Sequence, residues 1–173
     1  MPNNMKRLWK RFLTIIIAVA SGFIASCDRL PVYTHFQPVP QNGWEKEEAL
    51  LFTVSPVKEG GQYARQLGLR INSLYPFYNL CLVVEQTTVP SGHVCNDTLY
   101  CTLFDKGGRL KGKGVNYFQY AFPLNSVALE ANDSLVVSVK HNMKRNLLNG
   151  ITDVGFTLSP QQITPGINTQ KDK

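Results

Sequence analysis

The residue with the clearest chemistry in the sequence is Cys27, which ends the tetrapeptide Ile24-Ala25-Ser26-Cys27. A branched aliphatic residue, two small residues and a cysteine in this order form a bacterial lipobox. The thiolate of such a cysteine is the nucleophile that becomes a diacylglyceryl thioether, and the small residues before it let a membrane peptidase hold the extended backbone. The motif therefore predicts lipidation of Cys27, with residues 1–26 removed as a signal peptide.

The segment that presents Cys27 has the composition of a signal peptide. Its first part, residues 1–11, has basic side chains and no acid, and residues 12–25 are mostly apolar. A helix over residues 12–25 spans about 21 Å, short of the ~30 Å hydrocarbon core of a bilayer. Two or three acyl chains anchor a protein stably, because each buried methylene contributes about 0.8 kcal/mol. The alternatives are a plain secretory signal with a chance cysteine and a retained signal anchor.

The net charge of +6 lies mainly in this leader. After residue 26 the chain has 14 basic and 12 acidic residues, and no basic run that would steer a polyanion. This balance argues against a nucleic-acid-binding protein. The apolar fraction of 43% excludes a disordered chain, and 173 residues suit one ordinary domain.

The remaining residues match no catalytic signature. His35, His93 and His141 are scattered, and no serine lies in a Gly-x-Ser-x-Gly elbow. Residues 105–114 hold several glycines but lack the Gly-Lys-Ser/Thr ending of a phosphate loop, so they predict a turn. The sequence has no Cys-x-x-Cys pair, and the aspartates of its turns are far apart, which does not favour a metal site. Glu45, Glu47 and Glu48 lie together beside Lys46, in a segment that predicts a solvated turn. We therefore predict a protein that is not an enzyme and holds no metal or cofactor.

Three further cysteines, Cys81, Cys95 and Cys101, leave an odd number of thiols once Cys27 is lipidated. Cys81 and Cys101 could face each other if the segments around them form a hairpin that turns near Ser91. A bridge from Cys95 to Cys101 would instead close a small loop. Buried free thiols are the third alternative.

The mature region predicts an all-β fold, an antiparallel β-sandwich or jelly roll in a single domain. Eight segments with alternating or continuous apolar character are separated by Gly, Pro, Asn and Asp. They are residues 32–37, 49–55, 67–71, 79–86, 98–104, 117–122, 135–140 and 154–158. No segment is long enough for crossover helices, although residues 142–148 could form one or two helical turns.

This pattern predicts four parts in the chain. Residues 1–26 are the signal peptide, and residues 27–48 are a lipidated N-terminus and tether with a candidate first strand. Residues 49–159 form the sandwich, which begins near residue 31 if that first strand joins it. Residues 160–173 are polar and are expected to be disordered.

Two aromatic clusters suggest a binding function. They consist of Tyr75, Phe77 and Tyr78, and of Tyr117, Phe118, Tyr120 and Phe122. Aromatic residues of a β-protein more often fill its core, since each buries ~150–250 Å². Exposed rings on a sandwich instead bind sugars. A glycan-binding surface lipoprotein is therefore the alternative function, which Tyr117 or Tyr120 stacked outward would support.

Several short motifs occur in a fixed order along the mature chain. They are Trp44 with Lys46, Tyr75-Pro-Phe-Tyr-Asn-Leu80, Asp97-Thr98, Leu103-x-Asp105 with Gly108, Gly112 and Gly114, His141-x-Met143-x-Arg145, and Asn149-Gly-Ile-Thr-Asp-Val-Gly155. From the lipobox to about Ser159, the chain resembles the gliding-motility lipoprotein family GldH of the Bacteroidota. The three free cysteines and the polar tail after Pro160 depart from the family pattern.

The resemblance implies a lipid-anchored envelope protein of the gliding and type IX secretion machinery, with no known catalysis. It implies a membrane contact through the lipid, most readily with the outer membrane, and partners among envelope, motility or secretion proteins. Family members also occur in relatives that do not glide. Residues 149–155 predict a structural corner before the last strand, with a docking surface as the alternative.

Two tripeptides match the Asp-Ser/Thr-apolar pattern of O-glycosylation in Bacteroidota. They make Thr98, in Asp97-Thr98-Leu99, and Ser134, in Asp133-Ser134-Leu135, candidate acceptors. The alternative is a polar turn that enters a strand.

Overall fold

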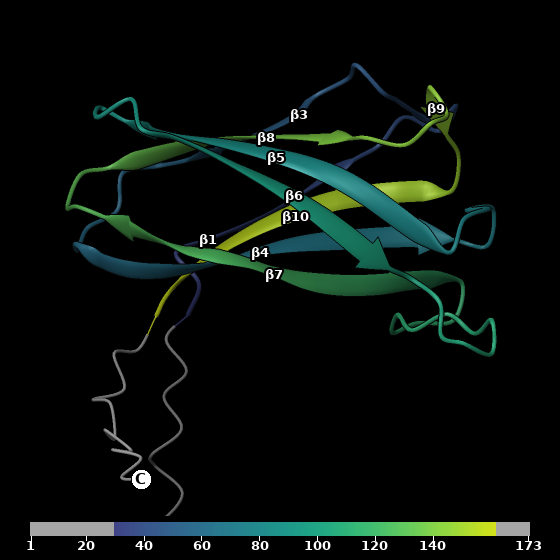
Figure 1. Ribbon diagram of the computed structural model, residues 1–173. Coiled ribbons are helices and arrows are strands. Elements are labelled where there is room, and N and C mark those ends of the chain that lie inside the picture. Colours follow the sequence, from purple (N-terminus) through teal and green to yellow (C-terminus); the bar gives the residue numbers. More distant parts are fainter. Residues whose placement is uncertain (1–29, 162–173) are drawn as a thin grey trace, which may run out of the picture.

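The computed structural model describes residues 30–161, so the predicted signal peptide, Cys27 and residues 162–173 of the predicted tail lie outside the described residues. The described chain consists of strands and loops, with no helix that could cross a membrane (Figure 1). The strands are β1 (Tyr33–Pro38), β2 (Trp44–Glu45), β3 (Leu50–Val54), β4 (Gly61–Asn72), β5 (Asn79–Val89), β6 (Val94–Thr102), β7 (Tyr117–Leu129), β8 (Ser134–His141), β9 (Leu147–Leu148) and β10 (Ile151–Pro160).

Eight of these strands form two packed antiparallel sheets. Their orders are β1-β10-β4-β7 and β3-β8-β5-β6, and β2 pairs with β9 in a separate short ladder. The β5–β6 hairpin is the one connection between these eight strands that stays within a sheet, and the others carry the chain to the opposite sheet. This wrapping is that of a jelly roll. The predicted all-β antiparallel sandwich is confirmed.

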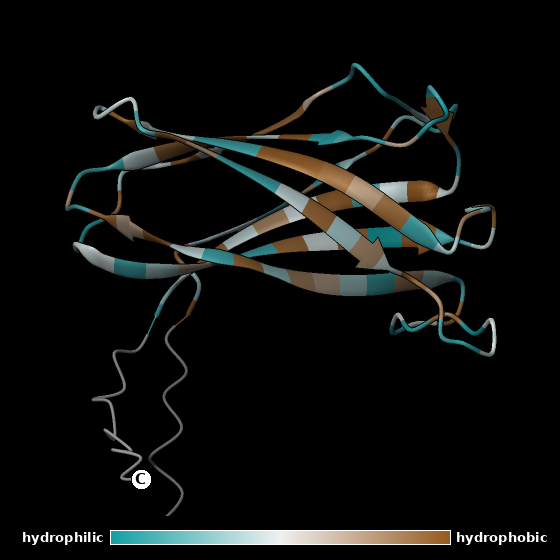
Figure 2. Cartoon of the chain, in the orientation of Figure 1, coloured by the Kyte–Doolittle hydropathy of each residue, from teal (hydrophilic) through white to brown (hydrophobic). Residues whose placement is uncertain are grey.

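Side chains that alternate along the strands form the core between the sheets. Figure 2 shows hydrophobic and hydrophilic residues in alternation on the longer strands. The buried positions of β4 and β5 include Tyr63, Leu67, Leu69, Ile71, Leu80, Leu82 and Val84. Burying one Leu or Ile side chain contributes roughly 1.5–3 kcal/mol, so this interface is the main source of stability.

Each predicted strand is present, and several extend beyond the predicted bounds. The strand β7 continues past Pro123, which cannot donate a ladder hydrogen bond but is tolerated because β7 is an edge strand. Residues 142–148 form no helical turn, and Leu147–Leu148 pair with Trp44–Glu45 instead. Because β1 pairs with β10, the sandwich begins before residue 49.

The two ends of the sandwich carry connections of different length. At the proximal end, where the described chain begins and ends, the turns are residues 55–60, 90–93 and 130–133. At the opposite, distal end the connections are residues 39–49, 73–78, 103–116 and 142–150, and they include β2 and β9. Figure 1 shows this separation. Loops on a rigid sandwich commonly carry function, so the distal end is the first place to look.

A buried arginine joins the two sheets on the side formed by β6 and β7. The side chain of Arg65 on β4 is 1% exposed, and its Nη2 lies 2.8 Å from Oδ2 of Asp97 on β6. Its Nη1 donates to Oε1 of Gln86 at 3.0 Å, and its Nε donates to the carbonyl of Asn125 at 2.7 Å. A buried guanidinium is costly without a partner, so Asp97 has a structural role.

Candidate functional site

The first and last of the distal loops are held together by a tryptophan and a histidine. Trp44 is fully buried, and its Nε1 donates to the carbonyl of Glu48 at 3.0 Å. Its ring meets the ring of His141 edge-on, with centroids 5.4 Å apart. The backbone N–H of Lys46 donates to the carbonyl of Asn146 at 2.7 Å. These contacts fix the position of the β2–β9 ladder.

The protonation of His141 follows from its hydrogen bonds. Its Nδ1 lies 3.4 Å from the backbone N–H of Met143, which donates to it, so Nε2 carries the proton that is donated to the Trp44 carbonyl at 3.2 Å. Burial lowers the pKa of His141 below the ordinary value of 6.5, although hydrogen bonds to the backbone of Trp44 and of Asn146 oppose the shift. Its surroundings therefore favour the neutral imidazole. Within residues 30–161 no group of three His, Cys, Asp or Glu side chains is placed to hold a metal.

The depressed pKa of His141 predicts a stability that depends on pH. Below about 6.5 the unfolded chain takes up a proton that the folded protein does not bind, so the free energy of unfolding falls as the pH decreases through this range. Urea denaturation between pH 7.5 and 5 measures the slope, which His141→Gln should reduce. His93→Gln, at an exposed side chain, is the matched control. An equal slope in wild type and His141→Gln would contradict this assignment.

The predicted corner before the last strand is a tight feature with two glycines. Gly150 has a φ of +84°, and a Cβ there would lie 2.2 Å from the backbone nitrogen of Tyr75. The backbone of Asn72 donates to the carbonyl of Gly150 at 2.8 Å. A Cβ on Gly155 would lie 2.6 Å from the ring of Phe36. The corner at Gly150 therefore packs directly on the β4–β5 turn, which explains the glycine there, whereas Gly155 lies within β10 and makes room for the ring of Phe36 on β1.

A cleft of about 760 Å³ opens beside this corner. Its walls come from β1 and the loop that follows, from the β4–β5 turn, and from the corner itself. The lining residues are Pro38, Val39, Pro40, Gln41, Gly43, Asn72, Leu74, Tyr117, Asn149, Gly150, Ile151, Thr152 and Asp153. Leu74 and Tyr117 are exposed, at 70% and 61%. We call this the distal cleft. It combines amide, hydroxyl and carboxylate groups with two exposed apolar side chains.

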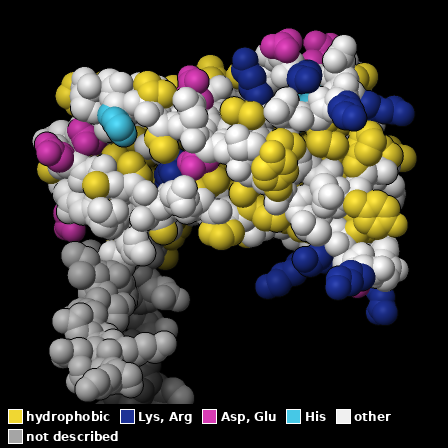
Figure 3. All heavy atoms as spheres, in the orientation of Figure 1, with side chains coloured by type: hydrophobic (Ala, Val, Ile, Leu, Met, Phe, Trp, Pro, Cys, Tyr) yellow, Lys and Arg dark blue, Asp and Glu magenta, His cyan; other side chains and the backbone are white. Residues whose placement is uncertain are grey.

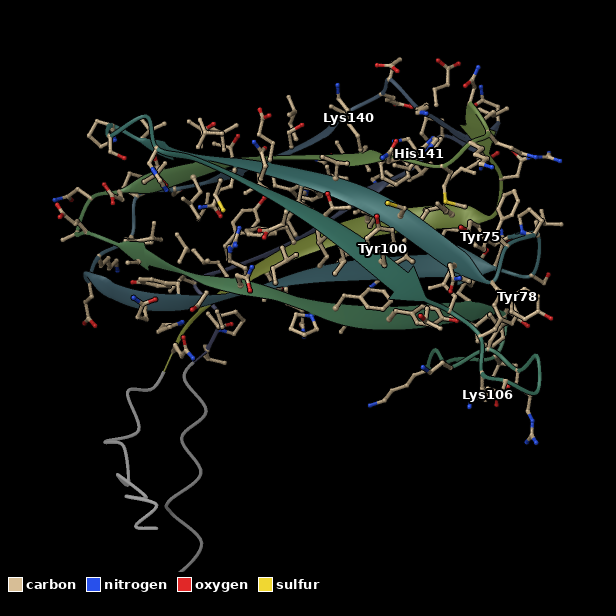
Figure 4. The ribbon with its side chains drawn as sticks, viewed as in Figure 1. Tyr75, Tyr78, Tyr100, Lys106, Lys140 and His141 are labelled. Carbon is tan, nitrogen blue, oxygen red and sulfur yellow. The ribbon has the colours of Figure 1, made fainter. Side chains whose placement is uncertain are left out.

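Next to the distal cleft the β4–β5 turn presents aromatic rings between two basic loops. Arg145 lies over the ring of Phe77 at 5.8 Å, and Tyr78 packs against Phe104 with ring centroids 5.1 Å apart. Figure 3 shows basic side chains above and below a hydrophobic area at this end, with acidic side chains beside the upper group, and Figure 4 shows Lys106 in the loop below Tyr78. We define the basic–aromatic surface as Phe77, Tyr78, Phe104, Lys106, Arg109, Lys111, Lys113, Lys144 and Arg145.

The aromatic cluster of residues 117–122 mostly fills the core. Tyr120 is buried and its hydroxyl donates to the carbonyl of Leu103 at 2.9 Å, while Phe118 and Phe122 are half-buried. Of this cluster Tyr117 alone is exposed, at the cleft. Tyr100, which lies outside both predicted aromatic clusters, is 77% exposed on the outer face of β6. The sequence could have predicted this exposure, because neighbouring residues of a strand point to opposite faces and the adjacent Cys101 is buried.

The three cysteines within the described residues are free thiols. The β5–β6 hairpin is present, but Cys81 pairs with Tyr100 and Cys101 pairs with Leu80. Neighbouring positions of a strand point to opposite faces, so the predicted hairpin does not bring Cys81 and Cys101 together as a bridge. Burial, followed by the nearby Cys81 thiol, raises the pKa of Cys101 to about 12.

This arrangement predicts two classes of thiol reactivity. In the folded mature protein at pH 8, Cys81 and Cys95, which are half-buried, should react with a thiol reagent, whereas Cys101 should react only after unfolding. Quenched labelling followed by peptide mass spectrometry measures each site. If Cys81 and Cys101 both failed to react and a reductant made both reactive, they would form a disulfide. That result would contradict the free-thiol arrangement.

The candidate O-glycosylation residues lie in different surroundings. Thr98 is exposed on the edge strand β6, directly after Asp97. Ser134 is half-buried at the start of β8, after an Asp133 whose Oδ2 accepts from the backbone of Glu130 at 2.9 Å. Modification at both sites stays a prediction, as does lipidation of Cys27, which lies outside the described residues.

Comparison with known proteins identifies the family. The sequence profile of the GldH lipoproteins matches residues 31–158, nearly the whole described chain. The chain belongs to the GldH lipoprotein family. It is 28% identical over 150 residues to the gliding motility lipoprotein GldH of Flavobacterium johnsoniae, covering 83% of this chain and 93% of that protein. It is 27% identical over 156 residues to a GldH homolog of Christiangramia forsetii, covering 85% and 94%.

Among solved structures, a family GH115 4-O-methyl-α-glucuronidase is similar with a TM-score of 0.48 and 13% identity. That similarity covers 79% of this chain and 18% of the glucuronidase.

Most of the GldH motifs meet at the distal end, although they are far apart in sequence. Trp44 contacts His141, Arg145 lies over Phe77, and Gly150 packs on Tyr75. Asp105 folds the 103–116 loop by accepting from the backbones of Gly107 and Arg109 at 2.8 and 2.9 Å. The motif at Asp97 is the exception, since it lies on β6 and holds Arg65. The motifs on which the resemblance rests therefore lie mostly at the distal end.

Proposed function

We propose that this GldH family protein is a lipid-anchored, non-catalytic component of the cell envelope that holds a partner protein at its distal end. We further propose that the anchor lies in the outer membrane and that the partner belongs to the gliding-motility or type IX secretion machinery. The observation that carries the proposal is the convergence of motifs far apart in the sequence on the distal loops, which build an exposed surface as well as a core.

The proposed anchor and the proposed docking end lie at opposite ends of the domain. The stretch from Cys27 to Tyr33 reaches at most about 20 Å when extended, so a lipid on Cys27 keeps the proximal end close to the membrane. The strand β4, with 12 residues, spans roughly 36 Å from the proximal to the distal end. A partner in the periplasm or at the cell surface would therefore meet the distal loops first.

Side chains of the types used in catalysis have structural roles in this domain. His141 bonds to Trp44, Asp105 and Asp133 fold turns, and Asp97 holds Arg65. These roles support a scaffold rather than an enzyme.

Crosslinking in native membranes tests the docking role. We would capture the C-terminally tagged lipoprotein after crosslinking and quantify partners by mass spectrometry, for wild type, for the distal variant Tyr78→Ser and for the control Val94→Ser. Val94 is an exposed apolar residue at the start of β6, near the proximal end. Recovery of motility or secretion components that only the distal variant loses would support the proposal. Recovery of abundant bystanders alone would contradict it.

The second candidate is glycan binding in the distal cleft. The specific observation is the exposed ring of Tyr117 in a cleft that also presents Gln41, Asn72 and Asn149, since an aromatic ring with amide partners suits a sugar. Glycan-array binding that Tyr117→Ala abolishes would favour this function. If no glycan on the array bound and partner capture stayed intact, docking would be the function that remains.

A further inference from the structure

The distal end carries a concentration of positive charge that the overall balance of the mature chain hides. The 103–116 and 142–150 loops together have one acidic residue, Asp105, against the basic residues Lys106, Arg109, Lys111, Lys113, Lys144 and Arg145. The single carboxylate is already engaged with backbone N–H groups of its own loop. Within residues 30–161 no ion pair involves a side chain of these two loops. The 142–150 loop pairs with the 39–49 loop, whose three glutamates partly offset its charge, so the positive charge open to a partner lies mainly on the 103–116 loop.

The proximal turns have the opposite balance. Residues 55–60, 90–93 and 130–133 carry Glu59, Glu130 and Asp133 against Lys58. The 39–49 loop adds Glu45, Glu47 and Glu48 against Lys46, so the distal connections together carry seven basic and four acidic side chains. The distal end is therefore net positive and the proximal turns are net negative. Such a division orients an approaching charged partner toward one end.

The rings of the basic–aromatic surface connect the two basic loops. Phe77 lies under Arg145 of one loop, and Tyr78 packs against Phe104 of the other. Tyr78 is 64% exposed, so apolar area lies beside the charges. Tyr, Phe and Arg are the residue types enriched at the centres of protein interfaces. A purely electrostatic binding site would not need this exposed apolar area.

From this juxtaposition we infer that the partner docks through an acidic protein segment that places an aromatic or aliphatic side chain on Tyr78 and its carboxylates on the flanking basic loops. This inference rests on the proposed docking function and specifies its chemistry. The guanidinium groups of Arg109 and Arg145 can each pair with a carboxylate through two hydrogen bonds. A lipid surface fits less well, because the proposed anchor is at the opposite end.

The test in membranes uses charge reversal. The variant Lys106→Glu/Arg109→Glu/Lys111→Glu/Lys113→Glu should reduce crosslinked partner by about tenfold or more, and the corresponding Gln variant should reduce it less. Lys58→Glu, in a proximal turn, is the matched control and should leave capture unchanged. All substituted side chains are exposed, so the melting temperature should stay close to that of wild type. Loss of capture in Tyr78→Ser with full capture in the charge-reversed variant would overturn this inference but retain the proposed docking function.

A direct binding measurement uses the mature lipoprotein in detergent and a defined probe. The probe is a fluorescein-labelled peptide of alternating glutamate and serine with one central tryptophan, measured by anisotropy at 50 and 300 mM salt. We expect binding that weakens about tenfold over this range, because exposed charges are screened. The Glu→Gln peptide should bind far more weakly. Equal binding of the Gln peptide, or tighter binding of the anionic polysaccharide alginate, would overturn the inference.

Discussion

Replacing Asp97 with alanine should lower the free energy of unfolding by about 3–5 kcal/mol. The change leaves the guanidinium of Arg65, whose side chain is 1% exposed, without the carboxylate 2.8 Å from its Nη2. Gln86 and the carbonyl of Asn125 accept hydrogen bonds from Arg65 but carry no negative charge. The side chain of Asp97 is 14% exposed, so water can partly solvate the Arg65 guanidinium once the carboxylate is removed. We therefore expect a loss near the lower end of this range. Chemical denaturation followed by circular dichroism measures the loss.

The ion pair between Arg70 and Asp153 provides the matched control. Its closest atoms are 3.9 Å apart and its side chains are 38% and 26% exposed, so Asp153→Ala should cost less than about 1 kcal/mol. The double variant Arg65→Met/Asp97→Leu removes both charges and should recover much of the loss of Asp97→Ala. Similar costs for Asp97→Ala and Asp153→Ala would contradict a structural role for the buried pair.

Gly150→Ala should destabilise the protein by at least about 2 kcal/mol. An alanine at a φ of +84° is strained, and its Cβ would lie 2.2 Å from the backbone nitrogen of Tyr75. Backbone cannot move aside as a side chain does, so the corner must lift off the β4–β5 turn. Because this turn carries Phe77 and Tyr78, the same variant should also lose partner capture in membranes.

A substitution at Gly92 is the control that separates backbone strain from steric contact. Gly92 has a φ of +70°, but a Cβ there would meet nothing within 4 Å, so Gly92→Ala should cost only about 1–2 kcal/mol. It lies in the proximal turn between β5 and β6 and should leave partner capture intact. If the two alanine variants were equally stable, the packing of the corner on Tyr75 would not be the cause.

The sequence predicted the strands because their signal is local. Alternating apolar residues located all eight main strands, and glycine and proline marked the turns between them. The order of the strands depends on pairs such as β1 with β10, which no local pattern specifies. The extension of β7 past Pro123 was missed for the same reason, because the tolerance of proline depends on its edge position.

Part of the candidate site could also be predicted. Gly150 correctly indicated a demanding corner, for which the structure supplies the reason in Tyr75, whereas Gly155 serves the packing of Phe36 within the sheet. The basic–aromatic surface was missed because its two basic loops are far apart in sequence and the overall charge is nearly balanced. The burial of Arg65 could have been predicted from the sequence, since Arg65 alternates with Tyr63 and Leu67 on the inward face of β4.

Site-specific photocrosslinking tests the docking role of the distal end most directly. A photoreactive phenylalanine analogue would replace Tyr78 at the distal end or Val94 near the proximal end, in the lipidated protein in native membranes. Both side chains are exposed, so both variants should fold. We expect the probe at Tyr78 to crosslink a motility or secretion protein and the probe at Val94 to give none. A specific crosslink at Val94 with none at Tyr78 would contradict the account.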